Sequence, residues 1–123
     1  MNIKDAIKAR HSVRQFQDRQ IANDLRNELN DAIAEANLES GLHIQIIYDE
    51  PECFDSLLAH YGKFHNVKNY IAIVGNIYLS KLEESGGYYG QKLVLLAQQL
   101  GLNTCWVGGS FGKKKCKAVL ENN

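Results

Sequence analysis

The chain has 123 residues, enough for one domain that buries roughly two-thirds of its unfolded surface in a single core. Lysine plus arginine and aspartate plus glutamate number 14 each, so no net field draws in nucleic acid or an anionic membrane. The N-terminus becomes polar within two residues, and no stretch approaches the roughly eighteen consecutive apolar residues of a membrane span. We therefore expect a soluble, cytoplasmic protein with no nucleic-acid or membrane partner.

The cysteines and histidines do not form a recognisable metal pattern. Cys53, Cys105 and Cys116 are odd in number and too widely spaced for a Cys-x-x-Cys redox or zinc pair. They are compatible with a reducing cytosol. His60 and His65 lie near each other, but no second ligand pair accompanies them at a zinc-site spacing. The sequence therefore predicts no metal site.

The first predicted element is an amphipathic helix whose apolar residues recur at spacings of three and four: Ile3, Ala6 and Ile7. A basic run, residues 10–16, follows it directly. If the chain leaves the helix in extended form, successive side chains alternate, so Arg10, Ser12 and Arg14 point the same way. Two guanidinium groups and a hydroxyl would then converge on one side of the chain.

That arrangement suits a phosphate, because arginine presents planar, permanently charged donors that can bind phosphate oxygens two at a time. Ser12 would add a short donor, and His11 a ring donor. The alternative is a solvated basic turn whose arginines complement the dipole at the end of the preceding helix. Spacing alone leaves both interpretations open.

The middle of the chain alternates between helical and extended patterns. A core-packing helix is expected over residues 23–37, with Gly41 as its stop and a strand over 42–48. A short helix over 51–61 would begin at the lone proline. The uninterrupted apolar run 70–75 predicts a strand covered on both faces, hence a central strand.

The longest predicted helix opens at a cluster of three glycines: Gly86, Gly87 and Gly90. Its apolar residues recur at helical spacing as far as Leu100, and Gly101 is expected to be its left-handed cap. A strand over 104–107 would follow and stop at Gly108 and Gly109. A terminal helix with a lysine-rich solvated face is expected after that.

The glycine pair at the end of this last strand has two interpretations. Gly108 and Gly109 would allow a ligand to approach the backbone closely and would offer bare N–H groups as donors. The alternative is an ordinary tight turn, for which Gly-Gly is a common signal.

Two stretches resemble a known family. The run Arg10-His11-Ser12-Val13-Arg14-Gln15-Phe16 resembles the N-terminal signature of the flavin-dependent nitroreductases. The stretch Gly87-Tyr88-Tyr89-Gly90-Gln91, with Leu-Gly-Leu-Asn-Thr-Cys-Trp-Val-Gly-Gly at 100–109, is similar to an internally duplicated branch of that superfamily. The resemblance covers the whole chain but only the N-terminal half of that branch. We therefore expect residues 1–123 to be one nitroreductase-like domain without the C-terminal half.

The resemblance implies an α+β nitroreductase-like fold, a mixed sheet with flanking helices, present as an incomplete half. It also implies FMN as the cofactor. The phosphate side of its site would be formed by four residues of the basic run: Arg10, His11, Ser12 and Arg14. A backbone N–H near N5 of the flavin would come from one of three residues: Val107, Gly108 and Gly109. No catalytic side chain is expected, because the organic chemistry belongs to the cofactor. Gln91 stands where that branch has glutamate, which leaves an acidic role there open.

The function implied by the resemblance is an FMN-dependent oxidoreductase that transfers hydride from NAD(P)H through FMN to nitro-, quinone- or enone-type acceptors. Two alternatives stay open: a flavin-binding module without turnover, and a structural or interaction domain that has lost the cofactor. A chain that packs against a partner half should expose an apolar patch. We therefore expect a homodimer or pairing with a second half.

Overall fold

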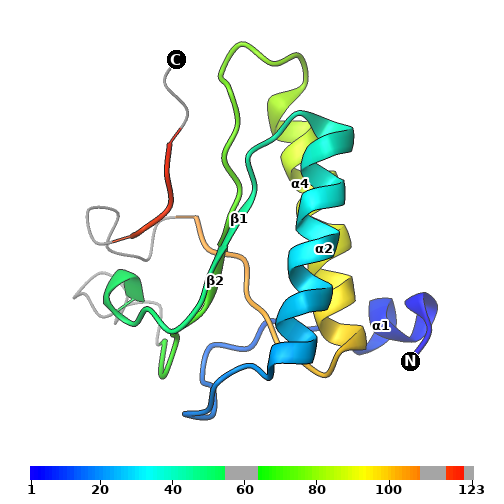
Figure 1. The fold of residues 1–123 in the computed structure, drawn as a ribbon. Coiled ribbons are helices and arrows are strands. Elements are labelled where there is room, and N and C mark those ends of the chain that lie inside the picture. The colour runs from blue at the N-terminus through cyan, green and yellow to red at the C-terminus, as the bar shows by residue number, and fades with distance from the viewer. Residues whose placement is uncertain (55–63, 109–115, 121–123) are drawn as a thin grey trace.

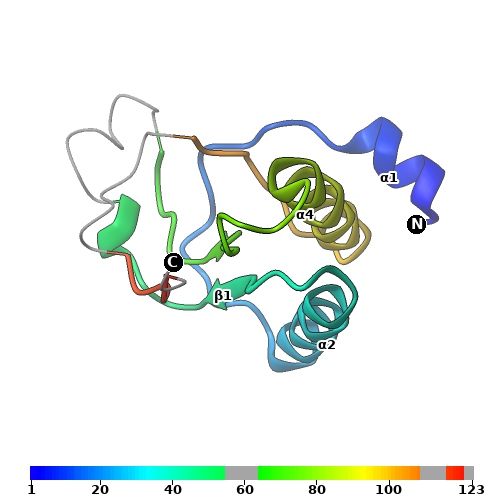
Figure 2. The ribbon, with the colours of Figure 1, turned by 90° about the horizontal axis from the view of Figure 1, so that it is seen from above.

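The computed structural model of the chain describes residues 1–54, 64–108 and 116–120. Within these residues three α-helices and a two-stranded antiparallel sheet form an α+β fold (Figure 1). The elements in chain order are α1 (Ile3–Ala9), α2 (Asn23–Ser40), β1 (Gln45–Ile47), a short 3-10 helix η1 (Glu52–Phe54), β2 (Tyr70–Ala72) and α4 (Leu82–Gln99). Helices α2 and α4 lie side by side, and α1 packs against α4 (Figure 2). None of the helices in the described ranges is both long and apolar enough to cross a membrane.

Helix α1 confirms the first predicted helix. Asn2 caps its N-terminus, since the side-chain Oδ1 accepts the backbone N–H of Asp5 at 2.9 Å. Of the predicted apolar face only Ala6 is buried, whereas Ile3 and Ile7 are 48% and 59% exposed. The helix therefore leaves two isoleucines in contact with solvent.

Helix α2 runs three residues further than the sequence predicts, and it ends at the predicted glycine. Gly41 has φ +76°, and its N–H bonds to the carbonyl of Asn37. The side chain of Asn37 then holds the next segment: Oδ1 accepts the N–H of Ile44 at 2.7 Å, and Nδ2 donates to the carbonyl of Ile44 at 3.0 Å. Asn37 thus pairs with Ile44 as a strand residue would, which fixes the approach to β1 against α2.

The two strands pair in the register Gln45↔Ala72, Ile46↔Ile71 and Ile47↔Tyr70. The strand predicted over 42–48 is therefore confirmed in its middle. The prediction of a central strand over 70–75 is wrong for the part of the chain that the structure describes. There β2 is only half-buried and pairs with β1 alone. An apolar run reports burial, and it carries no information about how many neighbours a strand has.

Helix α4 begins four residues earlier than predicted, so the expected opening glycines lie inside it. Gly86 and Gly90 are four residues apart, share one face of the helix and are both buried. A Cβ at Gly90 would come within 2.5 Å of Cδ1 of Ile73 and of Cη2 of Trp106. The glycine is therefore needed because two side chains occupy the space beside the helix.

The end of α4 has the predicted left-handed cap. Gly101 has φ +81°, its N–H bonds to the carbonyl of Gln98 at 3.1 Å, and the N–H of Leu102 bonds to the carbonyl of Ala97 at 2.8 Å. This pair of bonds is the Schellman arrangement. It sends the chain back along α4 into the segment 104–108.

The core lies between α2, α4 and the sheet. Its buried members form one apolar cluster: Ile33, Ala36, Leu42, Ile44 and Leu93. Among the described residues no polar or charged residue is buried as a whole. The core therefore satisfies the ordinary requirement that buried groups be apolar or hydrogen-bonded.

The cysteines differ from the expectation of a reducing environment. Cys53 and Cys116 form a disulfide, with Cα atoms 4.6 Å apart, while Cys105 is free. The 63-residue separation hides this pairing from sequence reasoning, because only the fold brings the two positions together. The disulfide joins η1 to the segment 116–120.

The predicted terminal helix is absent from residues 116–120, the part of it that the structure describes. This segment lies beside the sheet, where the side-chain amide of Gln45 both accepts the N–H of Val119 at 2.8 Å and donates to its carbonyl at 2.7 Å. The hydroxyl of Tyr70 accepts the N–H of Lys117 at 2.8 Å. These bonds replace those that a helix would have made.

Candidate functional site

The fold brings the two predicted parts of the site together. Ser12 and Thr104 form an isolated parallel bridge, and the N–H of Val13 bonds to the carbonyl of Thr104 at 2.9 Å. The basic run therefore lies alongside the segment 104–108. Figure 2 shows the two, in blue and in orange, near each other next to α4. The strand predicted over 104–107 is reduced to this single bridge in the described chain.

The basic run has the extended form that the phosphate interpretation assumed, and it is held on its other side as well. The N–H of Phe16 bonds to the carbonyl of His65 at 3.0 Å, and the N–H of His65 bonds to the carbonyl of Arg14 at 2.9 Å. The side chain of Asn66 also donates to the carbonyl of Phe16 at 3.1 Å. The backbone of the run is thus fixed between two segments, so its side chains project from an anchored base.

Arg10 is the residue through which α1 turns into this extended run. It is the C-cap of the helix, with φ −65° and ψ 129°, and its N–H bonds to the carbonyl of Ala6. Its Nε donates to Oγ1 of Thr104 at 3.3 Å. Its Nη2 is buried and has no hydrogen-bond partner within the described residues. Leaving a buried donor unpaired costs about 1–3 kcal/mol, and more for a charged group, so an acceptor placed beside Nη2 would stabilise this guanidinium.

The other predicted phosphate ligands lie on the same run with exposed side chains. His11 places Nδ1 3.1 Å from the carbonyl of Ala9. Ser12 and Arg14 are exposed to solvent. Their predicted role as phosphate donors stays a prediction.

The predicted N5 donors lie at the end of the neighbouring segment. Val107 is half-buried and Gly108 is exposed. A Cβ built on Gly108 would meet no heavy atom of the described residues within 4 Å, so none of these residues crowds the backbone there. Gly109 lies outside the described residues.

Trp106 belongs to this neighbourhood and was not singled out by sequence reasoning. It is 46% exposed, yet its indole Nε1 donates to Oε1 of Gln91 at 3.0 Å, and its ring edge occupies the space left by Gly90. A lone tryptophan two residues before a glycine pair was the available signal. Gln91 is therefore a hydrogen-bond acceptor for an indole in this structure.

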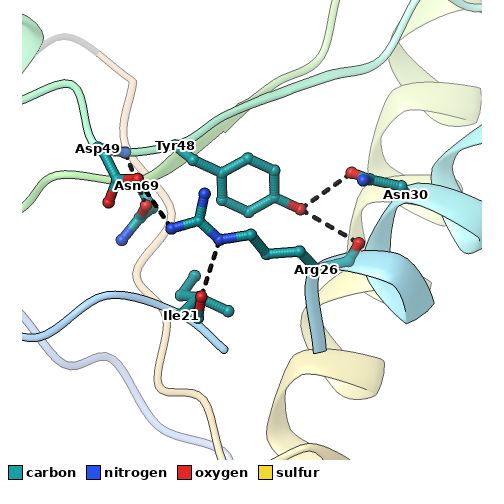
Figure 3. A network of polar contacts seen from close by, with 6 residues as sticks. All are labelled: Ile21, Arg26, Asn30, Tyr48, Asp49 and Asn69. Carbon is teal, nitrogen blue, oxygen red and sulfur yellow. Dashed lines mark hydrogen bonds and ion pairs between the residues drawn. The ribbon is translucent and has the colours of Figure 1, made fainter. Parts of the chain in front are cut away.

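The guanidinium of a second arginine, Arg26 of α2, has several partners (Figure 3). Its Nη2 lies 2.8 Å from Oδ2 of Asp49, and its Nε donates to the carbonyl of Ile21 at 2.8 Å. The guanidinium carbon lies 4.4 Å from the ring centroid of Tyr48, whose hydroxyl donates to Oδ1 of Asn30 at 2.9 Å. Burial raises the pKa of Tyr48, and the charge of Arg26 opposes this. This network ties α2 to the end of β1 and leaves little of Arg26 for a ligand.

A family model described as "Putative TM nitroreductase" matches residues 2–123. The chain belongs to this nitroreductase family. Membership indicates a general oxidoreductase role, and the α+β architecture is compatible with a nitroreductase-like fold. No curated protein and no solved structure matches the chain.

Proposed function

We propose that this nitroreductase is an FMN-dependent oxidoreductase that uses NAD(P)H to reduce nitro- or quinone-type acceptors. Nitroreductases generally use a flavin, which when bound supplies the hydride chemistry. The single observation that carries the proposal is the buried, unpartnered Nη2 of Arg10 beside Thr104. The protein's own part is to hold the cofactor and leave its reactive edge accessible.

The chemistry of Arg10 fits a phosphate group. Its Nε is engaged with Thr104, which orients the guanidinium plane, while Nη2 still needs an acceptor. A phosphate oxygen would satisfy that donor with a charge-assisted bond and would neutralise the buried cation. None of the ion pairs found among the described residues involves Arg10, so no carboxylate of those residues competes for it.

Neighbouring groups support the same assignment. Ser12, Arg14 and His11 would add donors from the exposed side of the run, where the phosphate and its attached chain meet solvent. Gly108, whose backbone none of the described residues crowds, would let a ring edge approach the backbone of residues 107–109. No side-chain acid or base is required for this role.

A partner remains part of the proposal. The exposed Ile3 and Ile7 lie on α1, the helix that ends at Arg10, and give the surface next to the site an apolar character. We propose that a second copy or a second nitroreductase half covers this surface.

The test is retention of FMN by the purified chain after removal of unbound flavin, followed by addition of NAD(P)H without oxygen. We expect the protein to retain FMN and the reductant to bleach it. Arg10→Met should weaken FMN binding by about 10–100-fold, the effect of one hydrogen bond to a charged group. Arg19→Met, in the exposed loop before α2, is the matched control and should bind as the native chain does.

The outcomes separate the candidate functions. Failure of the native chain to retain FMN, or equal retention by the Arg10→Met variant, would contradict the proposed site. Retained flavin that NAD(P)H does not bleach would make the protein a flavin-binding module without turnover.

A further inference from the structure

Trp106 is held by contacts with α4, yet much of the residue is exposed to solvent. Its indole Nε1–H donates to Gln91 at 3.0 Å, and the tip of its ring fills the space that a side chain at Gly90 would need. Nevertheless 46% of the residue is exposed. Aromatic residues normally gain their stability by burial, so a tryptophan that is held by a hydrogen bond while nearly half of it is exposed is suited to packing against another ring.

Trp106 lies close in the chain to Thr104, the residue that contacts the Arg10 guanidinium. Trp106 follows Thr104 by two residues, so the Cα atoms of the two residues lie at most about 7 Å apart. Thr104 is the residue that orients Arg10. A ligand whose anionic end meets Arg10 therefore has its other end near Trp106, and Gly108 follows two residues later.

We propose that Trp106 packs against the flavin ring of bound FMN and that Gln91 is the positioning residue that holds the indole in that orientation. The inference rests on the proposed function and adds to it a ring contact and its support. Trp106 would cover one face of the ring and leave the opposite face to the nicotinamide and the acceptor.

The role assigned to Gln91 explains which property that position needs. The indole N–H is a donor only, so its partner must supply an acceptor oxygen. The side-chain carbonyl of Gln91 does this in the structure, and a glutamate carboxylate would do it equally well. An acidic proton is not required there.

The experiment uses flavin fluorescence of the full chain loaded with FMN, with bound FMN quantified by absorbance after removal of free flavin. An indole in direct contact with a flavin quenches its emission. We expect weak emission from the native complex and at least a severalfold increase, for equal bound FMN, in Trp106→Leu. Tyr88→Leu is the matched control, because Tyr88 is an exposed aromatic residue of the same neighbourhood on α4, and it should leave the emission weak.

Gln91 is tested by its own pair of variants. Gln91→Leu removes the acceptor and should give intermediate emission and weaker FMN binding, whereas Gln91→Glu should restore both towards native values. The chain contains one tryptophan, so its intrinsic emission reports Trp106 alone. Addition of FMN to the native chain should quench that emission, and this readout needs no variant that might fold poorly.

Two results would overturn the inference while the proposed function stands. The first is FMN retained by Trp106→Leu with the same affinity and the same weak emission as the native complex. The second is tryptophan emission that ignores FMN and shifts only with protein concentration, which would assign Trp106 to a protein interface. Absence of FMN binding by the native chain would instead remove the proposed function, and the inference with it.

Discussion

Arg26 and Arg10 lie at comparable junctions, each where a helix meets an extended segment, but their guanidinium groups differ in how many partners they have. Around Arg26 the guanidinium has a carboxylate, a carbonyl and an aromatic face as partners (Figure 3). Around Arg10 one hydroxyl oxygen serves Nε, and a buried nitrogen has no partner in the described chain. The first junction holds the fold together, whereas the second leaves a buried donor whose energetic cost an added acceptor would relieve.

The same contrast extends to the aromatic residues. Tyr70, on β2, makes a hydrogen bond to Lys117 and another to Glu50, so its hydroxyl joins three parts of the packed region. Trp106 has its N–H satisfied, but nearly half of the residue is exposed. Satisfied polar groups with open apolar faces are typical of ligand sites, in which affinity comes from surface left uncovered.

The largest effect is expected at Gly90, which lies beside both Ile73 and Trp106. Gly90→Ala would place a methyl group 2.5 Å from Ile73 and from Trp106, so it should lower the free energy of unfolding by about 1–3 kcal/mol. Gly87→Ala is the control, because a Cβ there meets nothing within 4 Å, and it should be neutral or stabilise the helix by up to about 1 kcal/mol. Urea unfolding followed by circular dichroism measures both. Equal stability of the two variants would show that Trp106 is not seated on α4.

A smaller difference should separate the two arginines. Arg26→Met leaves Asp49 without its partner and should lower the free energy of unfolding by about 1–2 kcal/mol. Arg10→Met exchanges one hydrogen bond for removal of a buried unpaired donor, so it should change stability by less than about 0.5 kcal/mol. Thermal unfolding of both variants in the absence of FMN measures this. A strong loss of stability in Arg10→Met would make Arg10 a structural residue and weaken the contrast.

The smallest effect concerns the pH dependence of the packed region. Burial is the main cause that raises the pKa of Tyr70 above 10.0, and the N–H of Lys117 acts in the opposite direction. The folded state thus favours the neutral phenol. Its contribution to stability is complete below pH 10 and is lost as the pH rises from there through the folded pKa.

Tyr70→Phe should therefore reduce the loss of stability above pH 10. Some loss should persist, because burial raises the pKa of Tyr48 as well. Chemical unfolding at pH 8 and at about pH 10.5 measures the change. Tyr78→Phe, at an exposed position, serves as the control and should follow the native profile. If the loss of stability with pH were the same in Tyr70→Phe as in the native chain, the fold would not hinder ionisation of this phenol.

Sequence reasoning succeeded where the signal is local. The glycines that stop α2 and α4 were predicted correctly, because Gly41 and Gly101 adopt the left-handed conformation that glycine permits. The extended course after α1 was also expected, and the family match to residues 2–123 confirms the resemblance carried by the basic run and the stretch around Gly90. FMN, NAD(P)H and a dimer stay predictions.

Sequence reasoning failed where a residue's partner is distant in the sequence, or where a side-chain amide makes the hydrogen bonds that a strand backbone would make. The Cys53–Cys116 disulfide depends on where the fold carries residue 116. The pairing of Asn37 with Ile44 uses an amide that has no periodicity to reveal it. The early start of α4 was missed because glycines that serve close packing look like glycines that break a helix.

The bridge between Ser12 and Thr104 has a consequence for how the molecule forms. Arg10 and Thr104 are separated by 94 positions, so closing this contact encloses most of the chain in one loop. Such closure carries an entropic cost that grows with loop length, whereas α2, β1 and β2 meet within shorter stretches. Before the ribosome has added Thr104, the Arg10 end of the basic run lacks its partner, although Arg14 and Phe16 can already bond to His65. The corner formed by Arg10, Ser12 and Thr104 is therefore expected to assemble after α2, β1 and β2 have met.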